Sequence, residues 1–527
     1  MVARHGVVAS SILLLGGTRN GPRGQACREH VALRRSSPSL SASASGTLGA
    51  VASGVPLQQP SGPATVEPPL ISGSWFFGSA RELRADPLGP YRKVLESGRD
   101  LVRFRVGPPR VGFEFDAVLR PDGIRQVLAT DFGHYRKDAP VFGEIARFLG
   151  EGLLTSEGDR WRRDRRILQP LFTRKRVASY VGTIAEAAEE LVRSWREDAV
   201  AGRPVDLHDS SLRYALDALG RAIFGEDLAD VRPVVKDALP LLSEHAVRRG
   251  LAIVRLPPSL PTPSNRRAGA AQAGVYALVD RLIARRRASG HTGEDLLGLL
   301  LAAQDPEGTG GIDDRGIRDQ VLVFLLGGHE TTASALAFTL QLLASHPDVQ
   351  ERARAEATRV LENRRVAPAD VEQLRYTGQV VDEALRLYPP GHTVVRSAVE
   401  DRPLLGYSVP KGRIVALSFW GVHHNPSVWP DPERFHPDRF ARERSEPAGT
   451  DDKVAANHTR YAHLPFGGGP RACIGAHLAI AELVIAVAAV LRAYRLQAVV
   501  TRPELDVGLT LRPLGPLWCR LEALDPS

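Results

Sequence analysis

The segment Ile317–Ser345 constrains the fold more than any other part of the sequence, because it is apolar on nearly every side. It contains the runs VLVFLLGG and ASALAFTLQLLA, with only scattered polar residues. A helix on a protein surface keeps a polar face, whereas a helix that is apolar all round is covered by other elements. The sequence therefore predicts a long helix that runs through a core and that other helices pack around.

The segments on either side predict a mainly α fold with a smaller β region (α+β). Helical periodicity is present at 176–197, 207–224, 270–288, 348–361, 369–387 and 474–493. Short β-like runs lie at 101–106, 113–119, 393–399 and 407–419, the last interrupted by turn residues at 410–412. Residues 1–68 are rich in Ser, Ala, Gly and Pro, so we predict a poorly ordered extension there and a single domain over residues 69–527.

Composition excludes several classes of protein. The chain has 527 residues, is 43% hydrophobic and 24% charged, and carries a formal charge of +8, which is typical of a globular protein. Its three cysteines, Cys27, Cys473 and Cys519, form no C-x-x-C pair and predict neither a disulfide framework nor a structural zinc site. The apolar run at the N-terminus imitates a signal peptide but is too short to span a bilayer. We expect a cytoplasmic protein without a transmembrane anchor and without a nucleic-acid partner, with export as the alternative.

The predicted central helix contains residues that are unfavourable in a buried helix interior, in the run Gly327-Gly328-His329-Glu330-Thr331-Thr332. Glycines weaken a helix interior by about 1 kcal/mol each relative to alanine, and a buried glutamate needs a partner. Such local inconsistency is typical of a functional site. A zinc-protease motif H-E-x-x-H is the first alternative, but its second histidine is replaced by Ala333. The second alternative is a close helix crossing that the two glycines permit.

The stretch Phe466–Gly475, FGGGPRACIG, places a lone cysteine directly before a predicted helix. A helix N-terminus and the neighbouring Arg471 favour a thiolate, which could bind a metal whose flat macrocycle lies in the space left by the glycines. One alternative is the dinucleotide pattern G-x-G-x-x-G/A, but Pro465 spoils the strand that should precede it. The other alternative is a glycine turn with an inert buried cysteine.

Together these residues resemble the cytochrome P-450 family, whose heme-binding loop reads F-x-x-G-x-R-x-C-x-G. Phe466, Gly469, Arg471, Cys473 and Gly475 occupy every fixed position. The family's E-x-x-R motif is met by Glu383 and Arg386, and we assign its second arginine to Arg434, which would complete a buried ion-pair cluster. The resemblance covers residues 69–524.

The resemblance implies a heme-thiolate monooxygenase with a long distal helix and a cysteine loop that enclose heme b. Cys473 would be the axial thiolate ligand, with O₂ as co-substrate. The heme-binding residues would be Trp161, Arg165, Arg396, Phe466, Arg471 and Gly475, with Gly327 and Gly328 opening a groove for dioxygen. Glu330 and Thr331 match the acid–alcohol pair that supplies protons in the family. A heme-binding sensor or carrier without turnover is the alternative from another class.

The substrate implied by the resemblance is a lipophilic small molecule, hydroxylated or epoxidised in bacterial secondary metabolism on a terpenoid or polyketide. A fatty-acid hydroxylase is the alternative. Each of the residues that map to the family's substrate-contacting regions could instead fill the core. These residues are Leu325, Thr393, Val394, Val395, Leu509 and Thr510.

The electron donor implied is a separate ferredoxin or flavodoxin with its reductase, because the heme domain accounts for the chain and leaves no room for flavin domains. We predict docking near Arg160–Arg166, inside a segment (160–176) with eight basic residues and one acidic residue. Opposite charge speeds encounter with an acidic partner. The alternative is an ordinary solvated cationic face, and we expect a monomer.

Overall fold

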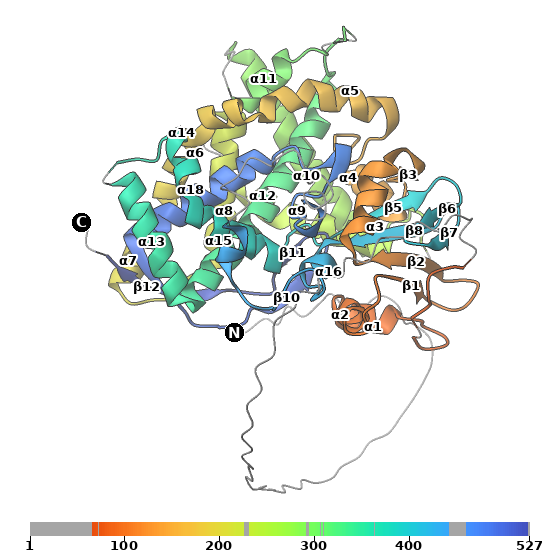
Figure 1. Ribbon diagram of the computed structural model, residues 1–527. Coiled ribbons are helices and arrows are strands. Elements are labelled where there is room, and N and C mark those ends of the chain that lie inside the picture. The colour runs from red at the N-terminus through yellow and green to blue at the C-terminus, as the bar shows by residue number, and fades with distance from the viewer. Residues whose placement is uncertain are drawn as a thin grey trace, which may run out of the picture. The chain divides into compact units, whose positions relative to one another are not determined.

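The protein is described by a computed structural model over residues 66–71, 73–225, 231–253, 255–290, 295–305, 307–308, 310–362, 364–441 and 460–524. Most of the predicted N-terminal extension, including Cys27, lies outside these residues. The mainly helical fold with a smaller β region is confirmed (Figure 1). The α-helices are α1 Ala80–Ala85, α2 Gly89–Glu96, α3 Pro121–Arg125, α4 Pro140–Leu149, α5 Gly158–Leu168, α6 Arg174–Ser194, α7 Arg196–Val200, α8 Leu207–Phe224, α9 Arg232–Gly250, α10 Pro263–Ala288, α11 Leu296–Ala302, α12 Asp314–Ser345, α13 Pro347–Leu361, α14 Pro368–Gln373, α15 Arg375–Leu387, α16 Phe419–His423 and α18 Ala476–Ala493.

Helix α12 is the predicted central helix, and α8, α15 and α18 pack around it (Figure 1). It begins three residues earlier than predicted, because the Asp313 side chain accepts a hydrogen bond from the Gly316 N–H at 2.9 Å and caps the first turn. By length and composition, α12 and α18 are the two helices in the described residues that could cross a membrane. Their most apolar stretches are 78% and 61% buried in the fold, as the core of a folded domain requires.

The largest sheet has the strand order β1-β2-β8-β5-β3 and lies to one side of the helices (Figure 1). Its pairs are antiparallel except β2 with β8, which is parallel. The predicted run at 407–419 is interrupted at its turn, as expected, and continues into α16. The strands are β1 Leu101–Val106, β2 Phe113–Val118, β3 Tyr135–Arg136, β4 Val205–Asp206, β5 Thr393–Ala398, β6 Arg402–Leu404, β7 Tyr407–Val409, β8 Ile414–Ser418, β9 Tyr494–Ala498, β10 Leu505–Val507, β11 Leu511–Pro513 and β12 Trp518–Ala523.

Two helix boundaries differ from the sequence prediction in ways that bear on the site. The helix predicted over 369–387 is divided at Leu374, where the backbone leaves the helical region (φ −76°, ψ 59°), so α15 carries the E-x-x-R motif alone. The helix after the cysteine begins at Ala476 rather than at Ile474, because Gly475 is its N-cap residue. Cys473 therefore lies in the loop before the helix rather than in its first turn.

Candidate functional site

The cysteine loop is closed by its own backbone. The Cys473 N–H donates to the Phe466 carbonyl at 2.9 Å, and the Ala472 N–H donates to the Gly469 carbonyl at 3.1 Å. Gly469 has a φ of +68°, and a Cβ at this position would lie 1.9 Å from the Leu128 carbonyl oxygen. Only glycine fits there. The loop is thus pressed against η1, the π-helix Gln126–Thr130.

The Cys473 side chain is accessible although protein surrounds it. Its side chain keeps exposed surface, yet burial is the main cause that raises the pKa of the thiol above its ordinary value. Both findings hold for a side chain that has accessible surface while many protein atoms lie around it. The Gly475 N–H and the Arg165 charge lower the thiol pKa in part. The expectation that Arg471 would do so is wrong, because the Arg471 guanidinium is turned to other partners.

Helix α5 brings two of the predicted heme-binding residues to this loop. Arg165 donates to the Ala472 carbonyl at 3.0 Å, one residue before the cysteine. The Arg471 guanidinium lies over the Trp161 ring, 4.3 Å from its centroid, which is a cation–π contact. Arg471 also donates to the Ser156 carbonyl and pairs with Glu157, each at 3.0 Å. Trp161, Arg165 and Arg471 therefore lie together as predicted, while their roles toward heme remain predictions.

Three buried cations gather beside this contact: Lys137, Arg396 and Arg471. Burial lowers the pKa of each of them, and the charge of Arg471 lowers the pKa of the other two further, that of Arg396 to about 10. Arg396 is 5% exposed and donates to the Val395 carbonyl of its own strand. Within the described residues, Glu157 is the carboxylate that offsets this charge. Positive charge therefore exceeds negative charge in this buried place.

Sequence reasoning missed Lys137. Its ammonium donates to the Leu154 carbonyl and lies over the Phe142 ring, 4.5 Å from the centroid. Nothing in the local run Tyr135-Arg136-Lys137 separates it from a surface lysine, because its burial arises from segments distant in the sequence. A cation over an aromatic ring in a desolvated place is stabilised by about 2 kcal/mol.

One face of α12 borders open space. From Asp319 to Ala344 every residue is buried except Val323, Gly327, Gly328 and Thr331. Val323, Gly327 and Thr331 are four residues apart and therefore share one face of the helix. A Cβ on Gly327 would meet nothing within 4 Å, whereas a Cβ on Gly328 would lie 2.8 Å from Leu219 of α8. The predicted groove thus belongs to Gly327, and Gly328 instead permits the close helix crossing that was the alternative.

Glu330 points to a different side of α12. One residue turns a helix by about 100°, and the Glu330 carboxylate pairs with Arg512 of β11 at 2.5 Å. The Thr331 hydroxyl donates to the Gly327 carbonyl within the helix. The predicted acid and alcohol are thus adjacent in sequence but face different surroundings.

The predicted ion-pair cluster is present, with one correction. Arg386 donates to both oxygens of Glu383, at 2.7 and 2.9 Å, and both residues are 0% exposed. The second arginine is Arg439, whose Nε lies 3.3 Å from Glu383. The assignment to Arg434 is wrong, because its side chain is exposed and only its backbone carbonyl meets Arg386. Two similar runs, PERF and PDRF, follow one another here, and the structure selects the second.

Most of the predicted substrate residues gather where β5 meets the β10–β11 hairpin. His392 contacts the Thr393 hydroxyl and the Gly508 carbonyl, both at 3.1 Å. Thr393, Val394, Val395 and Leu509 are half-buried, and Thr510 is 9% exposed. Leu325 is 0% exposed and packs in the core, so the expectation that it lines the pocket is wrong. Val323 occupies the accessible face of α12 instead.

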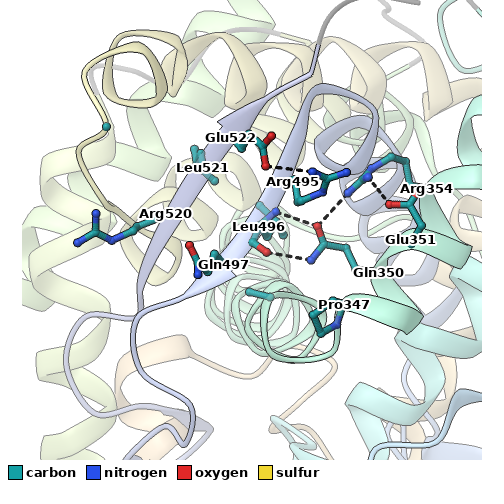
Figure 2. Close-up of a pocket in the computed structure, with 12 residues that line it drawn as sticks. Pro347, Gln350, Glu351, Arg354, Arg495, Leu496, Gln497, Arg520, Leu521 and Glu522 are labelled. Atoms are coloured by element: carbon teal, nitrogen blue, oxygen red, sulfur yellow. Dashed lines mark hydrogen bonds and ion pairs between the residues drawn. The ribbon is translucent and has the colours of Figure 1, made fainter.

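A separate pocket of about 550 Å³ lies between α13, β9 and β12. Figure 2 shows several of its polar and charged side chains bonded to one another, with Arg495 bound to Glu522 at 3.1 Å and Arg354 to Gln350 at 3.0 Å. No predicted site residue lines this pocket. It therefore has no part in the candidate site.

The residues around Cys473 fit a heme. A thiol that coordinates a metal ion is deprotonated, and the excess of buried cations is suited to the two carboxylates of the porphyrin edge. The accessible face at Gly327 leaves room beside the helix. Trp161, Arg165, Lys137, Arg396, Arg471 and Cys473 are the residues that would hold the group.

Comparisons with known proteins identify relatives of the chain. The family described as Cytochrome P450 matches residues 68–520. The chain is 36% identical over 402 residues to a cyclooctat-9-en-7-ol 5-monooxygenase of Streptomyces melanosporofaciens, covering 76% of this chain and 83% of that protein. It is 35% identical to a cyclooctatin synthase of the same organism, covering 79% and 87%, and 32% identical to human cytochrome P450 4F8, covering 77% and 81%. A crystal structure of a cytochrome P450DA heme domain superposes with a TM-score of 0.77 at 29% identity, covering 87% of this chain and 98% of that one.

Proposed function

The chain belongs to the cytochrome P450 family of heme-thiolate monooxygenases, and we propose that it hydroxylates a lipophilic, terpenoid-type cyclic molecule. The observation that carries this proposal is the similarity to two Streptomyces enzymes, one of which is named for oxidising the cyclic alcohol cyclooctat-9-en-7-ol. The half-buried apolar residues Val394, Val395 and Leu509 support it, because they suit an apolar ligand.

The chemistry of oxygen activation is supplied by the heme, whose cysteine ligand favours O–O cleavage. The chain's own residues bind and orient that group. Cys473 is the proposed iron ligand, and Lys137, Arg396 and Arg471 are the proposed partners of the heme carboxylates. The anionic heme carboxylates would offset the mutual repulsion of these three cations, so heme binding would compensate their charge.

Protons reach the reaction, in this proposal, through α12. The Thr331 hydroxyl lies on the accessible face beside Gly327, where a hydroxyl can both accept and donate a proton. Glu330 is the neighbouring acid. These roles follow from the family resemblance and from the accessible face of the helix.

The proposed electron donor is an acidic ferredoxin or flavodoxin in the cytoplasm. Arg174 and Lys175 are exposed on α6, whereas Arg162, which is exposed on α5, pairs with Asp159 at 2.6 Å. Arg160 and Arg166 of the predicted docking segment are engaged in ion pairs with Glu151 and Asp305. The exposed cations therefore carry this part of the proposal.

Spin-state titration tests the substrate class. We expect cyclic terpene alcohols to shift the absorption of the purified heme protein and linear fatty acids of equal carbon number to leave it unchanged. A shift with fatty acids alone would replace the proposal by the fatty-acid alternative. Product formation with NADPH and a ferredoxin pair would then exclude a sensor or carrier.

A further inference from the structure

His392 lies between the start of β5 and the turn of the β10–β11 hairpin, and its contacts there fix its tautomer. The Nε2 atom of its ring is 3.1 Å from the Gly508 carbonyl oxygen, and Nδ1 is 3.1 Å from the Thr393 hydroxyl oxygen. A carbonyl only accepts hydrogen bonds, so Nε2 carries a proton. Burial lowers the pKa of His392, so the ring is neutral near pH 7 and Nδ1 carries a lone pair instead of a proton.

This tautomer leaves Thr393 with an oxygen that accepts hydrogen bonds but does not donate them. A hydroxyl has one proton and two lone pairs. Because Nδ1 of His392 only accepts, the Thr393 proton is engaged with the ring. In the part of the chain that the structure describes, no other group is bonded to this hydroxyl. Its lone pairs are therefore open to a donor from outside the protein.

The segment that carries the two side chains is held on both sides. The Trp420 N–H of α16 donates to the His392 carbonyl at 3.0 Å, and the Leu511 N–H of β11 donates to the Pro390 carbonyl at 2.9 Å. Thr393 begins β5, which pairs with β8. Neighbouring elements thus fix the backbone, and the histidine fixes the direction of the hydroxyl proton.

The surroundings of the Thr393 oxygen are apolar and leave room. A Cβ on Gly391 would approach the Pro465 carbonyl oxygen to 3.9 Å and meet nothing closer, so there is space between this segment and the start of the cysteine loop. Thr393 is half-buried, as are the apolar residues Val394 and Leu509. A single polar atom among apolar side chains is how a pocket orients a mostly apolar ligand.

We propose that Thr393, oriented by His392, selects a lipophilic substrate that already carries a hydroxyl group, by accepting a hydrogen bond from that group. A ketone or an ether of the same skeleton has no proton to donate and leaves the Thr393 oxygen unpaired, which costs binding free energy. Thr393 would contact the substrate, and His392 is a positioning residue. The inference rests on the proposed function and narrows its substrate class to alcohols.

Spin-state titration of the heme-bound protein with matched alcohols and ketones tests the selection. The probes are menthol with menthone and cyclododecanol with cyclododecanone, because each pair shares one carbon skeleton. We expect each alcohol to bind about tenfold more tightly than its ketone, as one hydrogen bond to a desolvated acceptor allows. Equal dissociation constants within both pairs would overturn the inference. No shift with any of the four would contradict the proposed substrate class itself, and the inference would fall with it.

Two substitutions of Thr393 separate hydrogen bonding from shape. Thr393→Val keeps the branched shape without the oxygen, and we expect it to reduce the preference for the alcohol to within about twofold. Thr393→Ser keeps the hydroxyl and should keep the preference. Thr358→Val, on an exposed position of α13, is the control that should leave it unchanged. If Thr393→Val does not bind heme, Thr393→Ala takes its place. A preference that survives loss of the hydroxyl would refute the role of Thr393.

The variant His392→Phe tests the positioning role by reversing the selection. Without Nδ1 the Thr393 proton is free to donate to a ligand carbonyl, so we expect the ketones to bind about threefold more tightly than they bind to the natural protein. A merely structural histidine would weaken alcohols and ketones alike. Equal weakening of both would therefore refute the positioning role of His392.

Discussion

Two buried charge clusters in this molecule differ in whether their positive and negative charges balance. In the first, Glu383 receives Arg386 and Arg439 through its carboxylate oxygens and also accepts the His436 N–H at 2.9 Å. In the second, Lys137, Arg396 and Arg471 share the half-exposed Glu157 in the part of the chain that the structure describes. The first is a self-satisfied cluster, because its charged groups pair with one another. The second is a cationic cluster, because it keeps an excess of positive charge.

The difference separates structural from binding roles. A buried ion pair whose groups are all hydrogen-bonded fixes the elements that contribute to it, here α15 and the segment around η4 (Pro437–Phe440). A cluster of like charges destabilises the fold on its own, and an anionic ligand would offset the charge that Glu157 leaves uncompensated. The self-satisfied cluster should therefore govern folding, and the cationic cluster should govern cofactor binding.

The largest effect is expected from breaking the self-satisfied cluster. Arg386→Met leaves Glu383 buried without its bidentate partner, and we expect unfolding free energy to fall by about 3–5 kcal/mol. Urea unfolding measures this loss, with Arg520→Met on an exposed strand position as the control. A loss below about 1 kcal/mol would show that the cluster does not hold the fold.

A buried carboxyl outside both clusters gives a third case for the comparison. Glu482 is 2% exposed and accepts a hydrogen bond from the Thr332 hydroxyl at 3.3 Å. Burial raises its pKa from 4.5 to about 8, so the folded state keeps a proton that the unfolded state loses in this range. Stability should therefore fall as pH rises from about 5 to about 8.

The variant Glu482→Gln should remove this pH dependence. At pH 9 we expect it to be more stable than the natural protein by a few kcal/mol, because each pKa unit corresponds to about 1.4 kcal/mol. Below pH 5 the two proteins should differ little. Thermal unfolding over this pH range measures the difference, and an equal slope in both proteins would contradict the account.

Removing one charge from the cationic cluster should have two opposite effects, because the apoprotein becomes more stable while heme binding becomes weaker. Burial and the charges of Arg396 and Arg471 hold the pKa of Lys137 well below its ordinary value, so the folded apoprotein binds fewer protons than the unfolded chain and gains stability as pH rises. At neutral pH, Lys137→Met should stabilise the apoprotein by about 1 kcal/mol and weaken heme retention by about tenfold. Lys93→Met, at a 68% exposed position, is the matched control for both measurements. Loss of stability and of heme together would mean that Lys137 is simply structural.

A last pair of variants distinguishes two arginines of the same segment. Arg439→Gln removes a partner of Glu383 and should cost about 1–2 kcal/mol, while Arg434→Gln should stay within about 0.5 kcal/mol as an exposed change. Chemical denaturation of the two variants side by side makes the comparison. The reverse order would restore the sequence-based assignment of Arg434.

Local patterns were sufficient for the parts of the fold that depend on neighbouring residues. The apolar segment predicted α12, and the alternating runs predicted β1 and β5 close to their observed bounds. The loop around Cys473 could be recognised because its glycines and its cysteine lie within ten residues. These features are decided by periodicity and turn geometry, which a single sequence displays.

The burial and pairing of the other site residues depend on tertiary packing. Lys137, Arg439 and Arg512 meet partners contributed by other elements, so their own sequence surroundings carry no signal of burial or pairing. Similarly, the rotation of α12 decides that Val323 and Gly327 border open space while Leu325 packs in the core. Motif spacing places residues on a helix, but only the neighbouring elements show which face is free.

The reduced, carbon-monoxide-bound difference spectrum tests the central claim most directly, because its position reports the ligand of the heme iron. The account predicts the red-shifted band of thiolate ligation in the natural protein and its complete loss in Cys473→Ala, with Cys519→Ala as the control that keeps it. Retention of the band in Cys473→Ala would contradict the account.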